Sequence, residues 1–162
     1  MTAVQPVTLS DAILERFLRA ATTAAVPLVA ELGPGLSDHE ISDLGHALGD
    51  QIPSEIRTLW RWRAAPASPK HAWSWQINPE FELWPPTQSV TNTFEYRTML
   101  ETDPNLYDAP PTGVCFGGAR GFLFTDTARR GNLAPVGYLM VDDPEFEPAA
   151  PSLGALFMHW TA

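Results

Sequence analysis

The chain has 162 residues and a formal net charge of −9, from 19 acidic and 10 basic residues. A chain of this length predicts one domain that buries roughly 68–70% of its unfolded surface, so it needs no disulfide or metal to hold a core. Its negative field repels phosphate backbones and anionic lipids, which argues against binding to nucleic acid or membranes. The same charge would attract a basic partner, and solubility alone is the alternative interpretation.

The first predicted element is a helix that Ser10 can cap and that continues weakly to Pro27. The residues before it lack the basic start and apolar core of a signal peptide. No apolar run approaches the roughly 18 residues needed to cross a bilayer, so we expect a cytoplasmic protein.

A helical corner follows. Ser37 and Glu40 have the spacing of a capping box, and the apolar period behind them predicts a helix over 38–48 that ends at Gly49. A second helix is predicted from Pro53 to about Arg63, because proline suits the first helical turn.

Beyond this corner the apolar period changes from helical to alternating. Trp73, Trp75 and Ile77 predict a strand with one wet face, and 81–84 predicts a second short strand. Thr87 can cap a helix that runs to Leu100, although 90–93 is a poor helical sequence.

The carboxyl-terminal third predicts a polar loop over 101–112, followed by strands and a closing helix. The predicted strands are 113–116, 121–125 and 136–141, and Ser152 can cap a last helix to Trp160. This order of elements, in which helices are followed by strands and a final helix, predicts an α+β domain with a mainly antiparallel sheet.

Several motifs together resemble a known family. In chain order they are 35–41, 47–49, 52–53, 56–62, 83–86, 116–126, 135–139 and 152–160. Their order and spacing are similar to those of the SUKH superfamily, which includes a fungal cell-wall-synthesis regulator and many bacterial immunity proteins. The resemblance implies a SUKH-like domain over 35–162 with an N-terminal helical extension over 1–34. The sequence departs from the family at 63–66, where an Asn-Gly is usual, and in the loop 101–111.

The resemblance implies a non-enzymatic protein-binding module, an immunity or antitoxin type of protein that neutralises a toxin, for instance a nuclease. An acidic surface is complementary to such a basic partner. A second hypothesis is a cell-wall or glycan-linked module that uses aromatic side chains. A third is a small hydrolase that uses the acidic loop after residue 141.

The candidate partner-binding residues fall into two groups. One comprises charged residues near strand ends. The other is an aromatic pair for which a core position is the favoured interpretation and an exposed binding patch the alternative. They are Asp126, Asp142, Asp143, Glu145, Glu147 and Arg120, and then Trp73 and Trp75.

The sequence predicts no catalytic, cofactor-binding or metal-binding residue. Cys115 lies in an apolar run and is interpreted as a buried small side chain. His39 and His46 are about two helical turns apart, too far for one metal. The glycines of 117–121 lack the Lys-Ser/Thr ending of a phosphate loop, so we expect a hairpin turn there.

Overall fold

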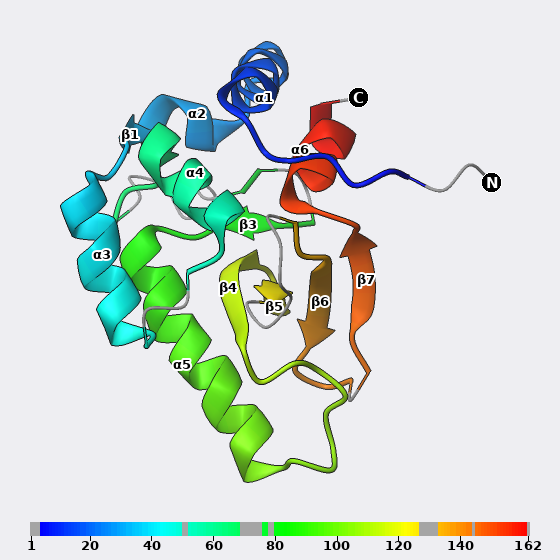
Figure 1. The fold of residues 1–162 in the computed structure, drawn as a ribbon. Helices are drawn as coiled ribbons and strands as arrows, with labels where there is room; N and C mark the ends of the chain where they lie inside the picture. Colours follow the sequence, from blue (N-terminus) through cyan, green and yellow to red (C-terminus); the bar gives the residue numbers. More distant parts are fainter. Residues whose placement is uncertain are drawn as a thin grey trace.

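The computed structural model of the chain describes residues 4–49, 52–68, 76–77, 80–126, 133–143 and 145–161. Within these residues a five-stranded antiparallel sheet lies among the helices (Figure 1). Its strands lie side by side in chain order: β3 (Glu82–Leu83), β4 (Gly113–Gly118), β5 (Gly121–Asp126), β6 (Val136–Met140) and β7 (Glu147–Ala150). A separate antiparallel pair consists of β1 (Gly33–Pro34) and β2 (Arg63–Ala64). The helices are α1 (Asp11–Thr23), α2 (Pro27–Glu31), α3 (Asp38–Ala47), α4 (Ser54–Trp62), α5 (Pro86–Thr102) and α6 (Leu153–Thr161).

The larger core lies on one face of the sheet, because successive strand residues point to opposite sides. Val114 and Leu123 belong to this core, together with residues of α1, α4 and α6. Phe17 of α1 and Phe157 of α6 meet edge to face, with their ring centroids 5.0 Å apart. The helices that precede the sheet and the helix that follows it therefore share one core.

The smaller core lies on the other face and is covered by α5. Cys115 and Phe124 pack there against Tyr96 of the helix. Thr93 completes the contact, because its hydroxyl donates to the carbonyl of Ser89 (2.7 Å) and accepts the N–H of Cys115 (2.9 Å). These contacts explain why the β-branched sequence of 90–93 is helical, since tertiary packing outweighs a weak propensity.

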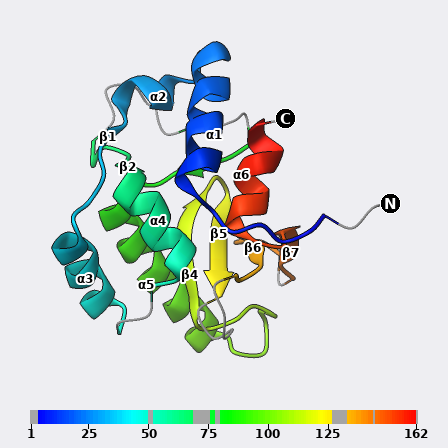
Figure 2. The same cartoon turned by 45° about the horizontal axis from the view of Figure 1, so that its top comes forward.

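The segment before α1 crosses the start of α6 (Figure 2). The Ser152 hydroxyl donates to the carbonyl of Val7 (2.6 Å) and accepts the N–H of Val7 (2.9 Å). The same hydroxyl accepts the N–H of Ala155 (3.1 Å), so the predicted cap of the last helix is present. One serine thus caps a helix and anchors the beginning of the chain.

The α+β class is confirmed, with a mainly antiparallel sheet, a helical corner before it and a terminal helix packed against it. The capping box is also present, because Ser37 and Glu40 exchange hydrogen bonds of 3.2 and 3.3 Å. Gly49 has a φ of +75° at the end of α3, in the left-handed region where glycine is favoured. The boundary between an extension and a domain at residue 34 stays a prediction.

Two helix predictions are corrected. The first helix ends at Thr23 and does not continue to Pro27, which instead begins the short α2. Helix α5 begins at Pro86, after an N-cap at Pro85 with no side-chain capping bond, so Thr87 is not its cap.

Two strands differ from the predictions or cannot be compared with them in full. Strand β7 is an edge strand that the sequence did not predict, because proline and glutamate, here Pro148 and exposed Glu147, are depleted in strands. Residues 73–75 of the strand predicted from Trp73, Trp75 and Ile77 lie outside the described residues. Its described end, Gln76, makes a single bridge to Glu82.

Candidate functional site

Four of the predicted partner-binding acids lie at one end of the sheet, around the connection from β6 to β7. Asp142, Asp143, Glu145 and Glu147 are all exposed, and we call them the acidic turn. The carboxylate of Asp143 accepts the N–H of Glu145 (3.1 Å). Among the ion pairs of the described residues, none involves a carboxylate of the acidic turn.

The other two charged candidates lie at opposite ends of β5. Arg120 is exposed in the turn before β5, and its carbonyl accepts the N–H of Val141 (3.4 Å), so its backbone adjoins the acidic turn. Asp126 is the last residue of β5 and accepts the Thr112 hydroxyl (2.5 Å). The structure thus brings Arg120 to the acidic turn and separates Asp126 from it along the strand.

The aromatic candidates Trp73 and Trp75 lie outside the described residues. Of the other tryptophans, Trp60 and Trp84 are buried, and Trp62 and Trp160 are half-buried. The Trp62 indole donates to Glu15 (2.9 Å). These described tryptophans serve packing and local hydrogen bonding.

The loop after α5 was predicted from the sequence, but its contribution to the candidate site was not. The loop is bonded to the connection between β6 and β7: Asp108 bridges to Glu145 through the backbone, and the Tyr107 hydroxyl donates to the carbonyl of Val141 (3.3 Å). The Tyr96 hydroxyl donates to the carbonyl of Pro110 (2.6 Å). The loop therefore lies against the acidic turn and brings a further carboxylate, Asp108, beside it.

A hollow of about 510 Å³ lies between this loop and strands β5 to β7, and we call it the strand hollow. Its lining is mainly apolar, with Phe124 and Phe146 in edge-to-face contact at 5.6 Å. Gly137 is required there, since a Cβ at this position would lie 2.5 Å from the Phe124 ring. Asp108 and Asp126 are the carboxylates that line it.

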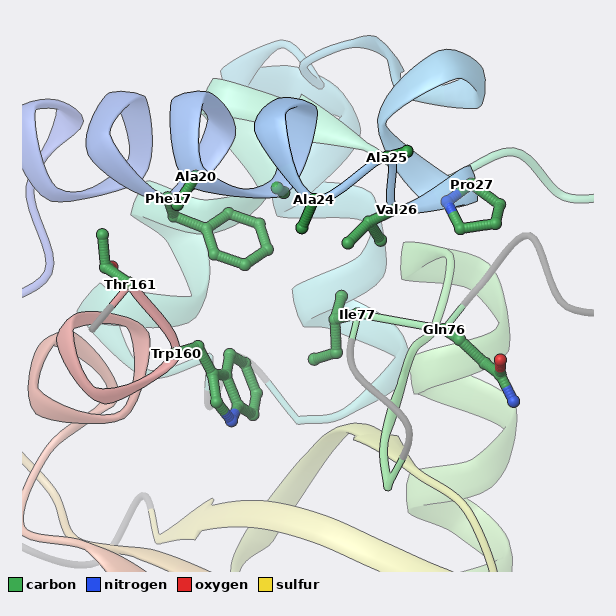
Figure 3. A pocket seen from close by; sticks show the side chains of 11 residues that line it. Phe17, Ala20, Ala24, Ala25, Val26, Pro27, Gln76, Ile77, Trp160 and Thr161 are labelled. Atoms are coloured by element: carbon green, nitrogen blue, oxygen red, sulfur yellow. The ribbon is translucent and has the colours of Figure 1, made fainter.

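A second hollow, of about 600 Å³, lies between α1, α6 and the segment 76–77, and we call it the helix hollow. Figure 3 shows Phe17, Ile77 and Trp160 directed into it. Among the described residues that line it, none carries a titratable side chain. The described lining of the helix hollow therefore offers mainly apolar contact and no carboxylate.

Burial raises the pKa of titratable groups inside the fold, among them Cys115 and Glu55. Burial raises the pKa of the Cys115 thiol well above its ordinary value, so it stays protonated and unreactive near neutral pH. Burial also raises the pKa of Glu55, although backbone N–H groups of Leu9, Leu153 and Gly154 partly oppose this effect. Both groups lie inside the fold, away from the acidic turn.

The described residues contain no group of three or more His, Cys, Asp or Glu side chains able to hold a metal ion. His39 lies 3.6 Å from Asp43 at the exposed surface of α3. Among the described helices, none has the length and apolar character needed to cross a membrane.

Comparison with protein-family models and with curated proteins gives no match for the chain.

Proposed function

We propose that the chain is a non-enzymatic protein-binding module of the SUKH type, which binds a basic protein through its acidic turn. The partner is expected to be a toxin that the chain neutralises, for instance a nuclease. The cytoplasm is the expected compartment of this encounter. The observation that carries the proposal is the acidic turn itself, four exposed carboxylates without an ion-pair partner among the described residues.

Like charges at one end of a sheet repel each other, so the four carboxylates do not stabilise the fold through one another. A basic partner removes this repulsion on binding and is also attracted over long range, which accelerates association. The bonded loop beside the acidic turn supports the same role, because an ordered surface loses less entropy on binding than a disordered one.

The other two hypotheses have less support. A glycan-linked role depended on Trp73 and Trp75, which lie outside the described residues. A hydrolase needs a carboxylate in a desolvated setting, whereas Asp142 and Asp143 are exposed. Both stay predictions.

The proposal is tested by crosslinking in the cells that produce the chain. A photo-crosslinking amino acid replaces Ala149, an exposed neutral residue of β7, and a second variant carries it at exposed Ala47 on α3. We expect one basic protein to be crosslinked from position 149 and not from position 47. Its purified complex with the unmodified chain should weaken about ten-fold between roughly 50 and 500 mM salt.

Two results would overturn this function. One is crosslinking of the same proteins from both positions, which would indicate random encounters. The other is a specific partner that is acidic, or whose affinity does not change with salt.

A further inference from the structure

The strand hollow adjoins the acidic turn but differs from it in chemistry. Its floor is the ring pair Phe124 and Phe146, and Phe146 remains 37% exposed although it is a large apolar side chain. Its outer wall is the loop that Tyr107 and Asp108 bond to the β6–β7 region. Phe124 is itself buried, so the solvent-exposed ring is that of Phe146, and covering this ring with another side chain gains free energy.

The rim of the strand hollow is negatively charged. Asp108 lines the hollow, is exposed, and is bridged through its backbone to Glu145 of the acidic turn. Asp126 lines the opposite strand end, where the Thr112 hydroxyl holds its carboxylate. The hollow therefore combines an aromatic and proline-rich interior with carboxylates at its edge.

We propose that the strand hollow binds an arginine or lysine side chain of the basic partner. This side chain anchors the partner that the acidic turn attracts. This inference rests on the proposed function and names the part of the partner that is recognised. The aliphatic stem of such a side chain covers Phe146 and Gly137, and its cationic end meets Asp108 at the rim. Long basic side chains combine these two properties, an apolar stem and a charged head.

Other occupants fit the charge pattern less well. A second copy of the chain would place two acidic turns against each other, which is repulsive. An anionic ligand or an anionic lipid surface is repelled by the same carboxylates. A purely apolar side chain would cover the aromatic floor but would bury Asp108 without a partner, at a cost in desolvation.

The inference is tested on the isolated chain with small probes that mimic the side chain. Butylguanidinium is titrated and followed through the backbone amide signals of Gly137 and Phe146 by nuclear magnetic resonance. Butylurea, which has the same shape without the charge, and pentanoate, which carries the opposite charge, are titrated in parallel. We expect saturable shifts with butylguanidinium, about two- to five-fold weaker binding of butylurea, and no saturation with pentanoate.

Two variants assign the effect to the strand hollow. Asp108→Asn should lower the affinity for butylguanidinium to about that for butylurea. Asp43→Asn removes the same charge from α3, outside the lining of the strand hollow, and should leave both affinities unchanged. Equal affinities of the wild-type chain for butylguanidinium and butylurea would overturn the inference without any variant. So would shifts that appear equally at all exposed acids.

The two proposals can fail separately. If the crosslinked partner binds with the expected salt dependence but butylguanidinium does not bind the strand hollow in preference to butylurea, the proposed binding of a basic side chain is wrong and the proposed function stands. If the probes select the hollow but no basic partner is crosslinked, the function is wrong and a cation-binding hollow remains.

Discussion

At the residue scale, Glu55 holds the two ends of the chain together. It lies in the first turn of α4 and is only 3% exposed. Its carboxylate accepts the N–H groups of Leu9 (2.8 Å), Gly154 (2.8 Å) and Leu153 (3.2 Å). The same side chain therefore anchors the N-terminal segment and satisfies unpaired donors at the start of α6.

Replacing Glu55 by Gln should lower the free energy of unfolding by an amount that depends on pH. The amide group removes an acceptor for one backbone N–H, so the free energy of unfolding should fall by about 1–2 kcal/mol near pH 4. Because the pKa of folded Glu55 is raised, its protonated form is the more stabilising one. That contribution is fully present below the unfolded pKa, about 4.5, and is lost as the pH rises through the folded pKa. The difference in free energy of unfolding between wild type and Glu55→Gln, which we call the gap, should therefore narrow towards pH 7.

Urea unfolding at several pH values measures this gap. Glu95→Gln, at an exposed position of α5, serves as the control and should differ from wild type by no more than about 0.5 kcal/mol. A gap for Glu55→Gln that widens with pH would contradict the account, since it would mean that the three N–H donors outweigh burial and hold the pKa of folded Glu55 below its ordinary value.

Glu55 also shows which residue roles a sequence can reveal. The capping box of Ser37 and Glu40 was predictable because its partners are three residues apart. The partners of Glu55 lie 46, 98 and 99 residues away, and no local pattern points to them. A glutamate in the first turn of a helix appears, in sequence alone, as an ordinary surface residue.

At the element scale, the end of α1 is a strained helix stop. The N–H of Val26 donates to the carbonyl of Ala21 (3.0 Å), and the N–H of Ala25 donates to the carbonyl of Thr22 (3.1 Å). This pair of bonds is the pattern of a Schellman motif. Ala25 has a φ of +54°, in the left-handed region where glycine is the favoured residue. With no glycine to mark it, this stop was invisible in the sequence, and the helix was predicted to continue to Pro27.

Ala25→Gly should therefore stabilise the protein. Removal of the Cβ relieves left-handed strain of about 1–2 kcal/mol per residue, and the added flexibility of the unfolded chain returns part of it, so we expect a gain of about 0.5–1 kcal/mol. The reciprocal change, Gly49→Ala at the end of α3, should cost about 1 kcal/mol for the same reason. Chemical denaturation midpoints measure both. Destabilisation by Ala25→Gly would show that the left-handed conformation at Ala25 carries no strain.

The elements differ in how far the sequence could predict them. Strands β4, β5 and β6 were recognisable because they are apolar and separated by turn residues. Strand β7 was not, because an edge strand tolerates proline and acidic side chains. The strand hollow depends on β7 and on the loop 103–112, and contacts between distant segments of this kind leave no periodic pattern.

At the scale of the whole molecule, negative charge is concentrated in the carboxyl-terminal part of the sequence. Residues 101–162 carry eight of the 19 acidic residues and three of the ten basic ones. The eight acids are Glu101, Asp103, Asp108, Asp126, Asp142, Asp143, Glu145 and Glu147, and the three bases are Arg120, Arg129 and Arg130. The described ion pair between Arg61 and Asp38 and the contact between His39 and Asp43 both lie in the amino-terminal helices. Composition predicted an acidic protein, but only the fold shows that the acidic turn and the strand hollow adjoin.

The most direct test of this account compares association rates of two variants with the crosslinked partner. One variant combines Asp142→Asn, Glu145→Gln and Glu147→Gln, and keeps Asp143 because its carboxylate accepts a backbone N–H within the turn. The control combines Asp11→Asn, Asp43→Asn and Glu95→Gln, which change the net charge by the same amount on α1, α3 and α5. We predict that the acidic-turn variant associates roughly ten-fold more slowly at low salt and the control nearly as fast as wild type. Equal slowing of both variants would contradict the account, because net charge alone would then explain the attraction.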